Sequence, residues 1–125
     1  MPQYKLTSVD FTSGRTELHD ALNLSGAEIS INLMPAGVSV PFVHAHKQNE
    51  EVYIVLEGKG TLYIDGEELP LKAGDCFRID PRGERCITAA ADSPIRFICV
   101  QTKQGSLEGF TMNDGVVSAS KASWL

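Results

Sequence analysis

The feature that most constrains the fold is a series of short segments rich in β-branched and aromatic residues, separated by turn residues. Such segments favour β-strands. Among the turns, Asp65-Gly66 is the strongest hairpin signal, and residues 57–60 (EGKG) form a second expected hairpin turn. The expected strands are residues 28–34, 38–46, 51–56, 61–64, 67–71, 76–79, 85–90 and 95–101. This pattern predicts an all-β sandwich or small barrel.

The length and composition of the chain fit one such domain. Its 125 residues are enough for one compact unit with a hydrophobic core, and 42% of them are hydrophobic. We expect an N-terminal segment over residues 1–26, a barrel over 27–104 and an apolar C-terminal arm over 105–125. A short helix is expected at residues 16–24 of the N-terminal segment. The arm is expected to pack on the barrel or on a second subunit. A homodimer would cover the exposed strand edges of a small sandwich.

Charge and cysteine content limit the expected partners and compartment. The net charge of −5 gives no electrostatic reason to bind nucleic acid or an anionic membrane surface, so neither partner is expected. The N-terminus lacks the pattern of a signal peptide, and no transmembrane segment is visible in the sequence. The three cysteines are widely spaced and form no CxxC pair, which favours a reducing, cytoplasmic setting.

A metal-ligand pattern lies between residues 44 and 51. His44 and His46 are two positions apart in an expected strand, so both imidazoles project from the same face. A turn would then bring the carboxylate of Glu51 beside them. Two imidazoles and one carboxylate form a facial triad, which binds one metal ion and leaves coordination positions open. Without further context, the same residues also fit two surface histidines and a solvated carboxylate.

The surrounding residues resemble the first motif of the cupin family. This motif has a glycine, the HxH pair, a glutamate and a second glycine, and residues 37–58 follow that order with one extra spacer residue before His44. Six residues separate Glu51 from Gly58, and this spacing selects Glu51 over Glu50 as the ligand position.

The second cupin motif is also present, in the right order and at the right separation. Residues 74–86 contain Gly74-Asp75 and Pro81-Arg82-Gly83, with one extra spacer residue between them. The resemblance covers about residues 27–101. It implies a small single-domain cupin, which is a double-stranded β-helix or jelly-roll barrel and often forms dimers.

The chain departs from the family pattern at Cys86, which stands where the third metal-binding histidine is expected. The resemblance implies that Cys86 faces inward with His44, His46 and Glu51. It could be a thiolate ligand, which would favour zinc or copper. It could also be a neutral buried residue that leaves three ligands, a reactive thiol beside the metal, or a sign that the site has lost its metal. The expected cofactor is one divalent transition metal ion, namely zinc, iron, nickel or manganese.

Three further residues are candidates for contact with a small-molecule ligand. Phe42 shares the parity of the two histidines, Tyr53 shares that of Glu51, and Gln48 lies in the turn beside the ligands. The cupin resemblance implies a metal-dependent enzyme of dioxygenase or isomerase type acting on a small polar organic substrate. It equally covers a non-catalytic module that binds or senses a small molecule, and the fold alone does not decide between them. No general base beyond the ligands is evident in the sequence.

Overall fold

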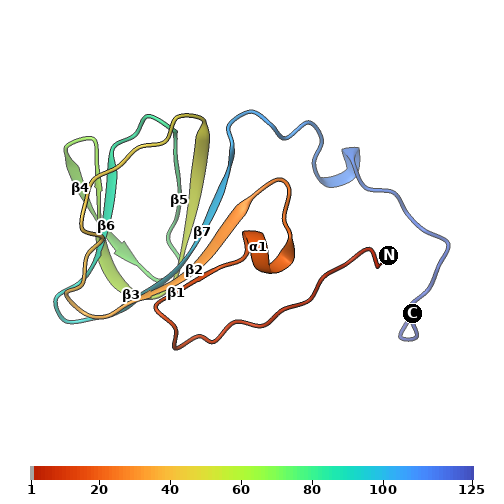
Figure 1. Cartoon of the computed structure of the whole chain (residues 1–125), viewed down its shortest axis with the longest axis horizontal. Helices are drawn as coiled ribbons and strands as arrows, with labels where there is room; N and C mark the ends of the chain where they lie inside the picture. Colours follow the sequence, from red (N-terminus) through yellow and green to blue (C-terminus); the bar gives the residue numbers. More distant parts are fainter. Residues whose placement is uncertain (1) are drawn as a thin grey trace.

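The computed structural model describes residues 2–125, and strands dominate it (Figure 1). The strands are β1 Arg15–Glu17, β2 Glu28–Met34, β3 Asn49–Ile64, β4 Glu67–Lys72, β5 Cys76–Ile79, β6 Arg85–Ala89 and β7 Ile95–Lys103. The described residues add one α-helical turn, α1 His19–Leu22, and a short 3-10 helix, η1 Thr111–Asn113. No helix in residues 2–125 is long and apolar enough to cross a membrane. The predicted all-β class is confirmed.

Strand β3 organises the barrel because it takes part in both of its sheets. The first part of β3 pairs with β5 on one side and β7 on the other, and β7 continues that sheet through β2 to β1. The last part of β3 pairs with β4 and β6. All these pairs are antiparallel, and the two sheets face each other as a jelly-roll barrel (Figure 1). The buried core between them includes Val55, Leu62, Ile87, Ile95 and Phe97.

The predicted hairpin turn at residues 57–60 is wrong, because β3 runs through these residues as one bent strand. The pairing with β7 shifts register between Val55 and Glu57, and Gly58 adopts a φ of +83°. A Cβ atom on Gly58 would overlap the carbonyl oxygen of Pro94. The glycine therefore marks a bulge and a close approach of two backbones, where the strand passes from one sheet to the other.

Two other sequence-based elements also differ from the structure. Residues 38–46 form no regular strand and contact β6 through two isolated bridges, Ser39 to Thr88 and His44 to Arg85. Pro41 lies between these bridges and has no N–H to donate to a ladder. The predicted helix at residues 16–24 is shorter, because residues 15–17 pair with β2 as the edge strand β1.

Strand β2 presents polar side chains to the barrel interior. Ser30 and Asn32 are 3% and 5% exposed, whereas Ile29 and Ile31 face outward and are half-buried. A strand with one face on a core normally has its apolar side chains inside and its polar side chains outside. The interior polar pair therefore needs partners inside the barrel.

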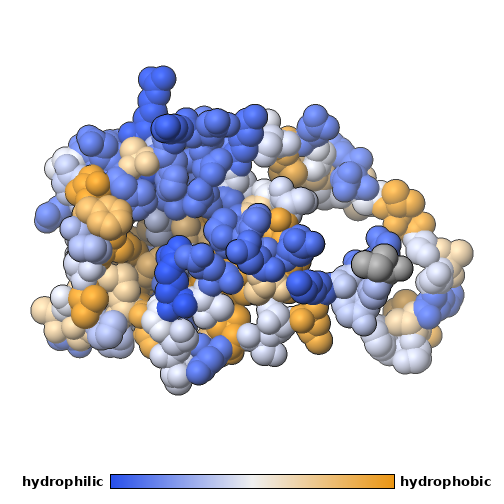
Figure 2. Space-filling view, viewed as in Figure 1, coloured by the Kyte–Doolittle hydropathy of each residue, from blue (hydrophilic) through white to orange (hydrophobic). Residues whose placement is uncertain are grey.

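The C-terminal arm stands away from the barrel at the right of Figure 1, and in Figure 2 hydrophobic residues lie among polar ones on that side. Phe110, Val116, Val117 and Trp124 are between 61% and 93% exposed. Of the two expected positions for the arm, packing on its own barrel is therefore not observed.

Candidate metal site

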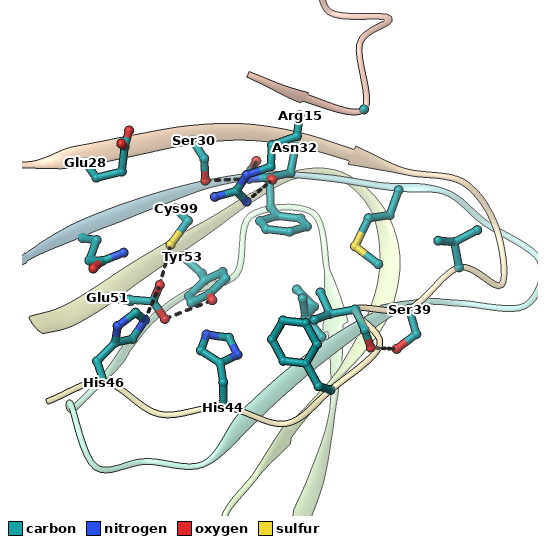
Figure 3. A pocket seen from close by; sticks show the side chains of 18 residues that line it. Arg15, Glu28, Ser30, Asn32, Ser39, His44, His46, Glu51, Tyr53 and Cys99 are labelled. Atoms are coloured by element: carbon teal, nitrogen blue, oxygen red, sulfur yellow. Dashed lines mark hydrogen bonds and ion pairs between the residues drawn. The ribbon is translucent and has the colours of Figure 1, made fainter. Parts of the chain in front are cut away.

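His44, His46 and Glu51 come together inside the barrel (Figure 3). Their candidate ligand atoms all lie within 4.8 Å of one another. The two histidines lie on the segment that runs beside β6, and His44 exchanges two backbone hydrogen bonds with Arg85. Glu51 lies on β3, where it pairs with both β5 and β7. The fold thus brings together side chains from opposite walls of the barrel.

Glu51 is 4% exposed, and each oxygen atom of its carboxylate accepts a hydrogen bond. The hydroxyl of Tyr53 donates to Oε1 at 3.1 Å, and the thiol of Cys99 donates to Oε2 at 3.4 Å. His46 Nε2 also lies 3.4 Å from Oε2. The carboxylate is therefore oriented with one oxygen toward the histidines, as outer-shell partners orient the ligands of metal sites.

Two ring nitrogens of this group are buried without a hydrogen-bond partner among the described residues. They are His44 Nδ1 and His46 Nε2, the latter because its approach to Glu51 is poorly aligned for a hydrogen bond. Buried polar atoms are almost always paired in native structures. Imidazole nitrogen and carboxylate oxygen are the donors that divalent transition metals take in facial triads. His44, His46 and Glu51 therefore fit one such ion, which when bound would polarise an oxygen-bearing ligand.

Arg85 is a buried residue of this site that sequence reasoning missed. It is 1% exposed, and its Nε lies 3.4 Å from Glu51 Oε1. Its Nη2 donates to the carbonyl oxygen of Asp80 at 3.0 Å. The guanidinium offsets the charge of Glu51 and opposes a cation beside it, but it contacts the carboxylate oxygen that does not face His46. A signal was available, because Arg85 shares strand parity with the apolar residues Ile87 and Ala89.

The structure does not bring Cys86 to the histidines and Glu51, which corrects the expectation that it faces inward. Cys86 lies on β6 between two buried residues, so alternation turns its side chain to the other face. Its thiol donates to the carbonyl oxygen of Val40 at 3.3 Å and lies 3.9 Å from the hydroxyl of Ser39. It lines a separate hollow with Tyr63 and Thr88. The candidate ligand set therefore has three members.

A cavity of about 500 Å³ contains the three candidate ligands. Of the predicted ligand-contact residues, Phe42 and Tyr53 line it, and the Phe42 ring lies 5.8 Å from that of His44. Gln48 does not line it, because it lies in a neighbouring hollow with Lys47 and Asn49. The cavity also has polar lining residues that the sequence did not point to: Arg15, Glu28, Ser30, Asn32, Ser39 and Gln101.

Burial sets the protonation of the groups around Glu51. Burial lowers the pKa of His44 below its ordinary value, although the charge of Glu51 opposes the shift. His44 is therefore neutral at pH 7, the form that binds metals. Burial first, and then the charge of Glu51, raises the pKa of Cys99 to about 12. Burial likewise raises the pKa of Tyr53 well above its usual range. Both groups keep the protons that they donate to Glu51.

A family model described as Cupin domain matches residues 30–101. The chain therefore belongs to the cupin domain family, as its two motifs predicted. The matched region begins in β2, ends in β7 and includes His44, His46 and Glu51.

Similar proteins share the fold but carry different names. A cupin protein from Bacteroides fragilis is 60% identical, with a TM-score of 0.91, and the match covers 94% of this chain and 99% of that one. An oxalate-binding protein from Thermotoga maritima is 31% identical over 54% of each protein. A sugar phosphate isomerase from Silicibacter pomeroyi is 27% identical, with a TM-score of 0.63, over 73% of this chain and 60% of that one. The chain spans about half the length of the curated relatives it matches.

We expect Cys99 to resist alkylation in the folded protein. With a pKa of about 12, only on the order of one thiol in 10,000 is ionised at pH 8, and the thiolate is the reactive form. Cys76 is exposed and serves as the internal control. Peptide mass mapping after iodoacetamide treatment should show Cys76 modified in the folded protein and Cys99 modified only after unfolding. Equal rates at the two cysteines in the folded protein would contradict this description of the site.

Proposed function

We propose that the protein binds one divalent transition metal ion, zinc, iron, nickel or manganese, through His44, His46 and Glu51. The ion holds a small polar organic substrate in the cavity for chemistry of the dioxygenase or isomerase type. The observation that carries this proposal is a group of two imidazoles and one buried carboxylate whose candidate ligand atoms lie within 4.8 Å of one another. One ring nitrogen of each imidazole is buried without a hydrogen-bond partner among the described residues. Three protein ligands leave coordination positions for the substrate.

The residues around the ligands support this function by orienting Glu51 and by giving the cavity an apolar lining. Tyr53 and Cys99 donate hydrogen bonds to its two oxygen atoms, and Arg85, whose Nε lies 3.4 Å from Oε1, offsets its charge. Apolar side chains, among them Ile87 and Phe97, line the same cavity. Electrostatic interactions between an ion and its ligand are stronger in a partly buried, low-dielectric site than in water.

A second candidate function is binding without turnover, and the protonation of the cavity favours it. Tyr53 and Cys99 keep their protons at neutral pH, so neither serves as a general base. Among the described lining residues, Glu28 is the carboxylate outside the candidate ligand set, and it accepts a hydrogen bond from the backbone N–H of His19. One relative is named as an oxalate-binding protein. Conversion of an added substrate by the metal-loaded protein would decide for the enzyme.

We also propose that two copies form a homodimer and that the C-terminal arm contributes to the contact. The arm carries several strongly exposed apolar side chains, and Val117 is 93% exposed. Exposed apolar surface of this extent is typical of association sites.

Substitution of Val117 tests the dimer directly. In a monomer, Val117→Asp would be nearly neutral because the side chain contacts solvent. In the proposed dimer Val117→Asp buries a charge at the contact and should shift the protein toward the monomer. Ser118→Asp, at the exposed neighbouring position, is the matched control. Multi-angle light scattering at micromolar concentration is the measurement. A wild-type mass equal to that of one chain would refute the dimer.

Removal of one imidazole tests the metal site. His46→Ala should weaken zinc binding about 100-fold or more, because one of three protein ligands is lost. His19→Ala is the control, since His19 lies outside the candidate group and pairs with Asp20. Affinities are measured by calorimetry on protein without an affinity tag. Equal zinc affinity in wild type and His46→Ala would show that the assignment is wrong.

A further inference from the structure

The cavity wall across from the histidines holds a positioned arginine (Figure 3). Arg15 comes from the edge strand β1, and its Nη1 donates to Oδ1 of Asn32 at 2.9 Å. The amide of Asn32 in turn donates to the hydroxyl of Ser30 at 3.0 Å and to the carbonyl oxygen of Phe97 at 3.4 Å. Polar side chains are costly in a core unless they are hydrogen-bonded. Here the buried pair of Asn32 and Ser30 forms a support that holds Nη1 of the partly exposed Arg15 side chain at the cavity wall.

Arg15 retains donors that the fold does not use. A guanidinium has five N–H groups, and Arg15 donates from Nε to Glu17 at 3.0 Å and from Nη1 to Asn32. No hydrogen bond from its Nη2 is formed within residues 2–125. The side chains of Arg15 and Glu17 are 56% and 59% exposed, so water screens both charges and the pair is weak. The guanidinium can therefore form a bidentate pair with the carboxylate of a ligand.

The balance of charge in and around the cavity favours an anionic ligand. Arg85 already offsets the charge of Glu51. Arg15 and Glu28 are the other charged side chains among the described lining residues, and Glu17, which does not line the cavity, pairs with Arg15. A divalent ion on the histidines and Glu51 would leave an excess of positive charge in the cavity, although the whole chain carries −5. An anionic ligand relieves such an excess.

The same cavity is lined by the candidate metal ligands, by Arg15 and by apolar side chains, including Met34 and Val40. Its volume of about 500 Å³ suits a small organic molecule. We infer that this ligand is a small organic acid whose carboxylate binds Arg15 while oxygen donors at its other end face the metal ion. The inference rests on the proposed function, because the ion defines the second end. Glu28 lines the cavity as well and disfavours a doubly charged phosphate relative to a singly charged carboxylate.

Calorimetry of the zinc-loaded protein tests this inference with defined probes. The probes are the dicarboxylates from malonate to adipate, each compared with its monoamide, which lacks the second charge. For the dicarboxylate that fits best, wild type should prefer the diacid about 10-fold or more. Arg15→Gln should abolish this preference and leave zinc affinity unchanged, because Arg15 lies outside the candidate ligand set. Arg15→Lys, which keeps the charge but not the bidentate geometry, should retain part of it.

The control is Arg78→Gln, because Arg78 is an exposed arginine that pairs with Asp80 and does not line the cavity. This variant should bind every probe as wild type does. Equal preference for the diacid in wild type and Arg15→Gln, or no preference in wild type, would overturn the inference. The proposed function would still stand if the wild-type protein binds zinc. Tighter binding of 3-phosphonopropionate than of succinate would overturn the assignment of a carboxylate. Failure of wild type to bind zinc would instead overturn the proposed function, and this inference with it.

Discussion

The buried carboxylate of Glu51 is the constraint on which the rest of the site depends. An isolated charge in a barrel interior is strongly destabilising unless it is paired and hydrogen-bonded. The structure meets this requirement with two neutral donors, Tyr53 and Cys99, and one cation, Arg85. Each of these groups contacts a specific carboxylate oxygen, so the same interactions that allow Glu51 to be buried also fix its direction. The resulting geometry leaves Oε2 beside His46.

Strand β3 connects this local arrangement to the whole fold. It carries Glu51 into the first sheet between β5 and β7 and, after its bend, pairs in the second sheet with β6. The β6 residue Arg85 bonds to the backbone of His44 and reaches Glu51 with its side chain. Arg85 therefore connects His44 and Glu51, two of the three candidate ligands, across the barrel. On β2, Asn32 accepts a hydrogen bond from Arg15, and this arginine places a positive charge on another side of the same cavity.

The sequence predicts most of the strands, the family and the group of His44, His46 and Glu51, because the spacing of residues within a motif is a local signal. The strand alternation expected for the two histidines does not apply, since residues 38–46 form no regular strand. It fails where long-range geometry decides. The glycines at residues 58 and 60 look like those of a turn. Gly58 is needed instead because the backbone of Pro94, from a distant segment, leaves no room for a side chain there. Cys86 matches the histidine position by count, but burial of Ile87 and Ala89 turns Arg85 inward instead. Arg15 carries no motif at all, and its role becomes visible only when Asn32 is found buried beside it.

The most direct test of the central claim is the location of a bound ion. A crystal of the untagged protein grown with zinc, with diffraction data collected at the zinc absorption edge, gives an anomalous difference map. We expect one strong peak inside the barrel, at about 2.0–2.2 Å from a ring nitrogen of His44, a ring nitrogen of His46 and a carboxylate oxygen of Glu51. A map with no peak there, while Glu51 keeps its contact with Arg85, would show that these three residues do not form a metal site.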